Sequence, residues 1–363
     1  MSIQKDLKKE KIDVTLQIDK ATSNHIVTNI SRRIAEAFPN YEFTQDSIYE
    51  KLSKLTMYKA KMTEGMAEAN YFYKNTSIYF NEHINYEDLE EFAIHECIHC
   101  LQEIKDERNK LLKLGLCNYS INKPTGLALN EAAVQYTSSY IIGVKADFEK
   151  YFGITLYTPS PSYYPLECSL LNEILYFTGD DNLFKSTLFS NDDFKNEIIK
   201  MSSENTYNKI QNLFDKILKM EENIIKLSNK ISFLEDGDSR IDKLNNKIND
   251  LKSKIALDYI STQNIIIKNF FDYEFNQISN LEELEKFRRR LYKFSNIIGA
   301  TPDYKFFDNY YVETMNKLEH KCNILENGGI ETALVPNRIN LFITFMKKLL
   351  SLKKEAKRDS SLL

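Results

Sequence analysis

The sequence predicts an α+β fold that is mostly helical, with its expected strands in the first part of the chain. Short runs rich in aromatic and β-branched residues occur before residue 84, whereas longer runs with apolar residues three and four apart dominate the remainder. A heptad spacing of apolar residues extends from about 203 to 270. These observations predict a domain with a small antiparallel sheet over residues 1–200, followed by an all-α region that contains a coiled-coil hairpin.

The first 84 residues are expected to supply the small sheet and two helices. Turn-forming residues separate the strand-like runs, and Lys74-Asn75-Thr76 has the composition of a hairpin turn. The expected strands are Val14–Ile18, Thr56–Met62, Ala69–Tyr73 and Ser77–Phe80, and the expected helices are Asn24–Phe38 and Ser47–Leu55. We therefore expect an antiparallel sheet that leads directly into the next helix.

Two helices that pack together are expected to follow the sheet. The first has a start signal at Asn85 and a stop signal at Gly115, after a lysine-rich turn. A short polar connection, Cys117–Thr125, leads to a second helix that continues toward Ile142 or beyond. The sequence then predicts an irregular, proline-containing stretch after Gly153 and a helix over Leu166–Phe177.

The region over residues 201–275 is expected to form an antiparallel coiled-coil hairpin. One set of apolar residues with 3-4 spacing runs from Ile210 to Leu234, and a second set, out of phase with the first, runs from Ile241 to Ile255. The break at Glu235–Asp238 separates two arms that would each project about 40 Å. The hairpin is interpreted as a structural arm or as a surface for a partner or for self-association. Residues 276–363 are expected to be helical and to end in the basic amphipathic segment Leu341–Arg358.

Composition and charge exclude several classes of function. The net charge of −4 and the isoelectric point near 5.9 provide no general attraction for nucleic acid. No run of 18 apolar residues and no signal-peptide core occurs, so we expect a cytoplasmic protein without a transmembrane segment, with non-classical export left open. Five cysteines in so long a chain do not suggest a disulfide framework and fit a reducing compartment.

The chain contains one H-E-x-x-H motif, formed by His95, Glu96 and His99. The two histidines are one helical turn apart, so both rings can leave the same face and bind one metal ion. Glu96 lies about 100° around the helix, beside the ion, where its carboxylate can take a proton from metal-bound water. This spacing is typical of zinc hydrolases.

A third ligand is expected from the second helix, where Asn130 precedes Glu131. Three protein ligands leave one open position for water, as catalytic zinc sites require. A rival interpretation is a structural zinc or redox site formed by Cys97 and Cys100, which make a C-x-x-C motif. Because both thiols point away from the histidine face of a continuous helix, we expect them to be buried in the core instead.

The pairing of His95-Glu96-x-x-His99 with Asn130-Glu131 resembles that of the gluzincin metallopeptidases over roughly residues 56–180. The resemblance implies a zincin-like catalytic domain, one Zn²⁺ per chain on His95, His99 and Glu131, and Glu96 as the residue that activates water. It also implies that Ala69–Tyr73 is the edge strand that pairs with a peptide or protein substrate. Thermolysin-like members have an aspartate where this chain has Gln135, and the G-A-M-E-N exopeptidase motif is absent, which favours an endopeptidase.

Two alternatives to a peptidase remain at this point. One is a non-catalytic scaffold or adaptor in which the zincin domain is vestigial and the hairpin binds partners. The other is a zinc hydrolase that acts on a non-peptide amide, because the ligand set is the same. The residue that stabilises an oxyanion is not assigned, although Tyr136, Tyr140, Tyr163 and Tyr164 are candidates. His83 and His320 are more simply interpreted as residues outside the site.

Overall fold

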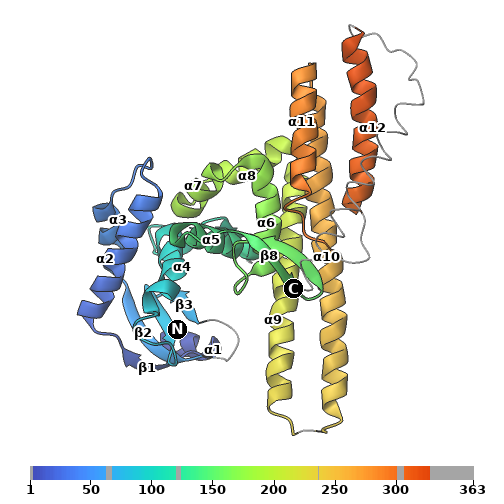
Figure 1. Ribbon diagram of the computed structural model, residues 1–363. Coiled ribbons are helices and arrows are strands. Elements are labelled where there is room, and N and C mark those ends of the chain that lie inside the picture. The colour runs from blue at the N-terminus through green and yellow to red at the C-terminus, as the bar shows by residue number, and fades with distance from the viewer. Residues whose placement is uncertain (1–2, 63–67, 120–123, 236, 301–305, 328–363) are drawn as a thin grey trace. The chain divides into compact units, whose positions relative to one another are not determined.

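Residues 3–62, 68–119, 124–235, 237–300 and 306–327 are described by the computed structural model in Figure 1. Helices dominate, and the described strands form three small sheets, so the prediction of a mostly helical α+β fold is confirmed. The chain divides into two compact units. The first comprises residues 1–266 with 299–302, and the second comprises residues 267–298 with 303–363.

The first sheet has four strands in the order β1-β2-β4-β3, where β1 is Asp13–Gln17, β2 is Thr56–Lys61, β3 is Ala69–Phe72 and β4 is Ser77–Asn81. The predicted turn joins β3 to β4 as an antiparallel hairpin. The expectation of a wholly antiparallel sheet is wrong, because β2 and β4 run parallel. The reason is that β3 pairs on the outer side of β4, so two reversals of direction bring β4 back alongside β2. Strand β3 is therefore one edge of the sheet and β1 is the other.

Helices α2 (Lys20–Ala37) and α3 (Gln45–Leu52) pack with one face of this sheet. The side chain of Asp19 caps α2 and that of Thr44 caps α3, so both helices begin close to where the sequence predicts. Buried apolar residues of α2 and of the strands share one core with the motif helix. The other face of the sheet packs with α1 (Ile3–Lys9), where Leu7 contributes to a smaller core.

The motif helix α4 spans Leu89–Gln102 and is shorter than the sequence predicts. The expected end at Gly115 is wrong. Residues after Gln102 instead form β5 (Glu103–Lys105), β6 (Leu111–Leu114) and β7 (Cys117–Asn118). The turn between β5 and β6 explains the difference, because Asp106 Oδ1 accepts hydrogen bonds from the backbone N–H groups of Arg108 and Lys110. Such a carboxylate offers the backbone an alternative to the helix.

Helix α5 (Leu127–Ile142) confirms the second predicted helix and packs against α4. Strand β9 (Ile154–Thr158) lies in the stretch after Gly153 that was expected to be irregular, and it forms a hairpin with β8 (Asp147–Tyr151), which precedes that stretch. The alternation of Ile154, Leu156 and Thr158, all buried, was the overlooked signal. Helices α6 (Pro165–Thr178), α7 (Asp181–Phe189) and α8 (Asp193–Met201) follow.

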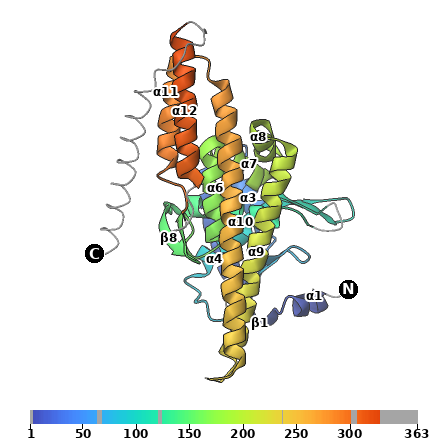
Figure 2. The same ribbon diagram turned by 90° about the vertical axis from the view of Figure 1, so that its right-hand side faces the viewer.

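Helices α9 (Glu204–Ser232) and α10 (Arg240–Gln277) form the antiparallel hairpin that the heptad spacing predicts. Figures 1 and 2 both show the two helices side by side, with the turn at the end of the arm. An ion pair between Lys216 Nζ and Asp258 Oδ2, 2.7 Å apart, joins them. Helix α9 and residues 240–266 of α10 belong to the first unit, together with the motif helix.

The second unit contains the end of α10 with α11 (Leu281–Phe294) and α12 (Phe306–Glu326). Its core is aromatic, since Phe271 meets Phe287 and Phe294 edge to face at 5.7 and 5.3 Å between ring centroids. The predicted amphipathic segment Leu341–Arg358 lies outside the described residues. Within the part of the chain that is described, no helix is both long and apolar enough to cross a membrane.

Candidate metal centre

The histidines of the motif and the carboxylate of Glu131 converge at one point between α4 and α5. His95 Nε2 lies 3.1 Å from His99 Nε2, and Glu131 Oε2 lies 3.3 and 3.4 Å from these two nitrogens. Ligands about 2.05 Å from one ion in tetrahedral geometry would be separated by about 3.3 Å. The three residues therefore have the spacing of one face of a tetrahedral site, and as a group they could hold a metal ion.

Two glutamines orient the histidine rings. Gln135 Oε1 lies 2.9 Å from His95 Nδ1, and Gln102 Oε1 lies 3.1 Å from His99 Nδ1. Because an amide oxygen can only accept, both Nδ1 atoms carry the proton in this arrangement, and both Nε2 atoms are left to face Glu131. Gln135, noted in the sequence as standing where the thermolysin-like pattern has an aspartate, thus supports the ring of His95. Gln102 was missed, although its position three residues after His99 places it on the same face of α4.

Asn130 has a structural role next to the ligand. It is fully buried and exchanges amide hydrogen bonds with Gln102, at 3.2 and 3.3 Å. Its Oδ1 also accepts the backbone N–H of Leu116 at 2.9 Å. Gly115 makes this packing possible, because its φ is +56° and a Cβ at that position would collide with the side chains of Gln102 and Asn130. In the Asn-Glu pair, Glu131 is therefore a candidate ligand, and Asn130 holds Gln102, which in turn holds His99.

The electrostatics of the three residues are strongly coupled. Burial favours neutral His99, but the neighbouring Glu131 carboxylate outweighs burial and raises the pKa of His99 to about 9. Burial would raise the pKa of Glu131, yet His99 and His95 hold it well below its ordinary value. Without an ion the centre is thus a buried ion pair. A metal ion would take the place of the imidazolium proton beside the same carboxylate.

Glu96 lies next to the three residues and faces the sheet. It is 8% exposed, and its Oε2 accepts the backbone N–H of Tyr71 at 2.6 Å. This N–H is not donated to β4, so the N–H and C=O of Tyr71 point away from β4, toward the unpaired edge of β3. The motif carboxylate and the predicted substrate strand are therefore in direct contact.

Of the four tyrosines considered as oxyanion donors, Tyr164 lies beside the centre. Its ring stacks on that of His95, with 6.1 Å between centroids and 21° between planes, and burial together with Glu131 raises its pKa well above the ordinary value. Its φ of +51° is unusual for a bulky residue. The rings of Tyr136 and Tyr140 pack against Phe184, and that of Tyr163 packs against Phe92. His83 pairs with Glu68 at 2.9 Å, and His320 lies in α12 of the second unit.

Cys97 and Cys100 are buried in the core of the first unit, as expected, and are not part of the group that could hold an ion. Burial raises the pKa of Cys97 well above its ordinary value and that of Cys100 to about 11. Neutral thiols are poor metal ligands. The structure therefore does not place Cys97 and Cys100 together with other ligands as a metal site.

Comparisons of the chain with known protein families, with curated proteins and with solved structures found no match.

Proposed function

We propose that this chain is a zinc-dependent endopeptidase in which His95, His99 and Glu131 hold one ion and Glu96 is the general base. The observation that carries the proposal is the convergence of the three ligand atoms within 4.8 Å of one another. Two imidazole nitrogens and one carboxylate, with a fourth position open, form a donor set that suits catalytic zinc. When bound, the ion supplies Lewis acidity, which polarises a carbonyl and makes a water molecule acidic near neutral pH.

Glu96 is placed to move the proton in this reaction. Glu96 follows the His95 ligand directly in the chain, and its carboxylate is held by the Tyr71 N–H at 2.6 Å, so its position is set before substrate arrives. In the proposed reaction it takes a proton from the attacking water and delivers it to the leaving amine. The hydroxyl of Tyr164, whose ring stacks on His95, is the proposed donor to the oxyanion.

Strand β3 is the proposed substrate-binding strand, and its outer edge is where the substrate would pair. Alternation along a strand places the N–H and C=O of Ala69 on this edge together with the C=O of Tyr71, so an extended peptide would pair with these groups while the Tyr71 N–H holds Glu96. Such pairing would carry the scissile bond past Glu96. Main-chain hydrogen bonds recognise any extended peptide, which is consistent with cleavage inside a chain rather than at a terminus.

The first experiment is zinc stoichiometry by elemental mass spectrometry on the parent and on Glu131→Ala. We expect one zinc per chain in the parent, markedly less in Glu131→Ala, and an unchanged value in Glu149→Ala, which removes an exposed carboxylate of β8. A folded parent that takes up no zinc after metal supplementation would overturn the proposal. A peptide-library screen then compares the parent with Glu96→Gln, and small amides tested in parallel separate a peptidase from an amidase.

A scaffold function is the second candidate, and the hairpin carries it. Phe233, at the end of α9, is 85% exposed, and Leu257 on α10 is 71% exposed. These two side chains are the proposed points at which a partner would contact the hairpin. The Glu96→Gln variant discriminates between the two functions, because a scaffold would keep its biological effect whereas a peptidase would lose it. Phe233→Ser should weaken the biological effect of a scaffold and leave that of a peptidase unchanged.

A further inference from the structure

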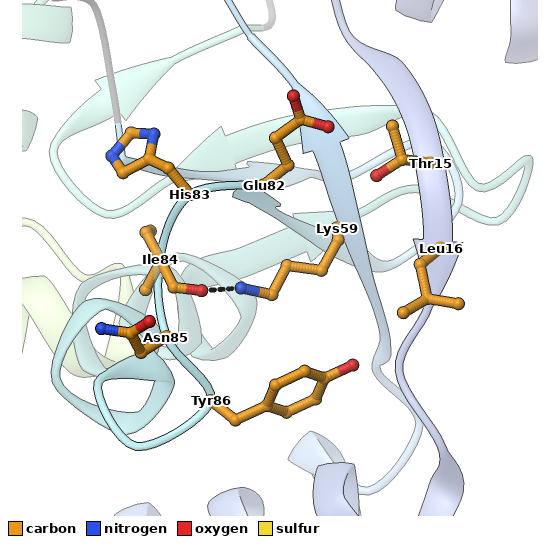
Figure 3. Close-up of a pocket in the computed structure, with 8 residues that line it drawn as sticks. All are labelled: Thr15, Leu16, Lys59, Glu82, His83, Ile84, Asn85 and Tyr86. Carbon is orange, nitrogen blue, oxygen red and sulfur yellow. Dashed lines mark hydrogen bonds between the residues drawn. The ribbon is translucent and has the colours of Figure 1, made fainter.

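A cavity of about 340 Å³, whose lining includes none of the three candidate ligands, lies at the β1 edge of the four-stranded sheet. Figure 3 shows the residues that line it: Thr15 and Leu16 of β1, Lys59 of β2, and Glu82 to Tyr86 of the loop between β4 and α4. Its size lies within the range of small-molecule sites.

Lys59 is the unusual member of this lining. Its side chain is on the same face of the sheet as that of Leu16, because the two residues are paired in register across a bulge at Thr15. Lys59 is only 5% exposed, and its ammonium donates one hydrogen bond, to the carbonyl oxygen of Ile84. The ammonium also lies 5.2 Å from the centroid of the Tyr86 ring.

A buried ammonium is normally paired with a carboxylate. Among the described residues, Lys59 forms no such ion pair. The Glu82 carboxylate is 4.0 Å from Lys61 Nζ, and Figure 3 shows it turned away from the Lys59 ammonium. Burial lowers the pKa of Lys59, and no acid in the described part of the chain offsets that effect. Two of the three ammonium donors of Lys59 therefore have no acceptor among the described residues, and the side chain faces a cavity.

We propose that this cavity binds a small organic carboxylate, whose charged end accepts hydrogen bonds from Lys59 and whose apolar part packs between Leu16 and Tyr86. A single ammonium matches a single negative charge, and the nearby Glu82 carboxylate disfavours a dianion such as phosphate. Leu16 is 52% exposed and Tyr86 is 51% exposed, so a flat or branched apolar group would cover surface that is now in water. The carboxylate could belong to a free acid or to the C-terminus of a peptide.

The test is a titration of the full chain that is monitored by saturation-transfer NMR. Benzoate represents a free acid, and N-acetylphenylalanine represents the C-terminus of a peptide. Benzamide and N-acetylphenylalaninamide are the neutral controls. We expect at least one of the two acids to bind at least about tenfold more tightly than its amide, because the amide cannot form a charge-assisted hydrogen bond. Which acid binds identifies the source of the carboxylate. Inorganic phosphate is expected to bind more weakly than the better acid.

Variants then locate the binding. Lys59→Met keeps the length of the side chain and should weaken acid binding at least about tenfold, whereas Lys54→Met, which removes an exposed lysine, should leave it unchanged. Leu16→Glu is the second variant, since it places a carboxylate beside Lys59 at an exposed position and should block the cavity in a folded protein. Absence of binding by either acid up to about 20 mM, or equal binding by Lys59→Met, overturns the proposal.

The titrations are repeated in the Glu131→Ala background, because a carboxylate is also a ligand for an ion at the metal centre. Binding that persists in Glu131→Ala and disappears in Lys59→Met belongs to the cavity. Binding that disappears only in Glu131→Ala belongs to the metal centre and contradicts this inference without affecting the proposed peptidase activity.

Discussion

The carboxylate of Glu96 accepts the backbone N–H of Tyr71 at 2.6 Å, and this contact ties the motif helix to the free edge of the sheet. One residue of the motif is thus held by the strand on which a substrate would lie. Helix and strand are 25 residues apart in sequence at this contact, and it depends on β3, not β4, being the outermost strand.

Under the proposed function, Glu96→Gln is expected to lower peptidase activity strongly and to leave zinc binding intact. The amide oxygen can still accept the Tyr71 N–H, so the local structure should be retained, but an amide cannot take a proton from water. We expect kcat to fall by about 10²–10⁴-fold, with unchanged zinc content by elemental analysis. Glu91→Gln, an exposed change on the same helix, is the matched control. Near-parent activity in Glu96→Gln would refute its role as the base.

Gln102→Ala is expected to weaken metal binding although Gln102 is not a ligand. Its Oε1 holds His99 Nδ1 at 3.1 Å and its amide pairs with Asn130, so truncation releases the ring of one ligand. Loss of such supporting contacts typically costs about 10–100-fold in metal affinity. Competition with a zinc chelator measures the effect, and exposed Gln45→Ala serves as the control. Equal zinc affinity in parent and Gln102→Ala would mean that the contact is dispensable.

Gly115→Ala is expected to destabilise the fold more than Gly153→Ala. Both glycines have positive φ, at +56° and +79°, so each alanine carries a backbone cost of about 1–2 kcal/mol. At Gly153 nothing lies within 4 Å of the added methyl group, whereas at Gly115 it would overlap Gln102 and Asn130. We therefore expect a loss of about 3 kcal/mol or more at Gly115, together with weaker zinc binding. Urea unfolding compares the two variants, and equal losses would contradict the steric argument.

Glu173 is expected to make stability fall as the pH rises from about 4.5 to 8. It is fully buried on α6, and burial raises its pKa to about 8, although hydrogen bonds from Gln263 and from Gly299 N–H partly oppose this. Across that window the folded state keeps a proton that the unfolded state has lost, so the free energy of unfolding decreases with pH. The loss should amount to a few kcal/mol, on the order of 1.4 per pKa unit.

Glu173→Gln tests this effect, because an amide stays neutral at every pH. Unfolding by urea at pH 5 and pH 8 should give a smaller pH dependence in Glu173→Gln than in the parent, with the variant more stable than the parent at pH 8. Exposed Glu149→Gln should follow the parent. An unchanged pH dependence in Glu173→Gln would show that the buried carboxyl does not titrate in this range.

Local periodicity could be predicted from the amino-acid sequence alone. His95 and His99 share a helix face because they are one turn apart, and the heptad spacing with its break at Glu235–Asp238 defined the two arms of the hairpin. Both depend on neighbours within a few residues, which an isolated sequence displays directly. The sequence also predicted that Glu131, on the next helix, lies near the two histidines, and the structure places it there. Two helices joined by a short connection pack together, which brings Glu131 beside α4.

Which distant groups meet depends on the packing of the whole fold and could not be predicted from local patterns. Helix α4 ends at Gln102 because Asp106 accepts backbone hydrogen bonds in the turn that follows. Strands β2 and β4 are parallel because β3 pairs on the outer side of β4. Gln102, Tyr164 and Lys59 are positioned by contacts with Asn130, His95 and Ile84, which lie on other elements or loops. Strand pairing and burial are non-local, because their free energy depends on surfaces that chain folding brings together from separate segments.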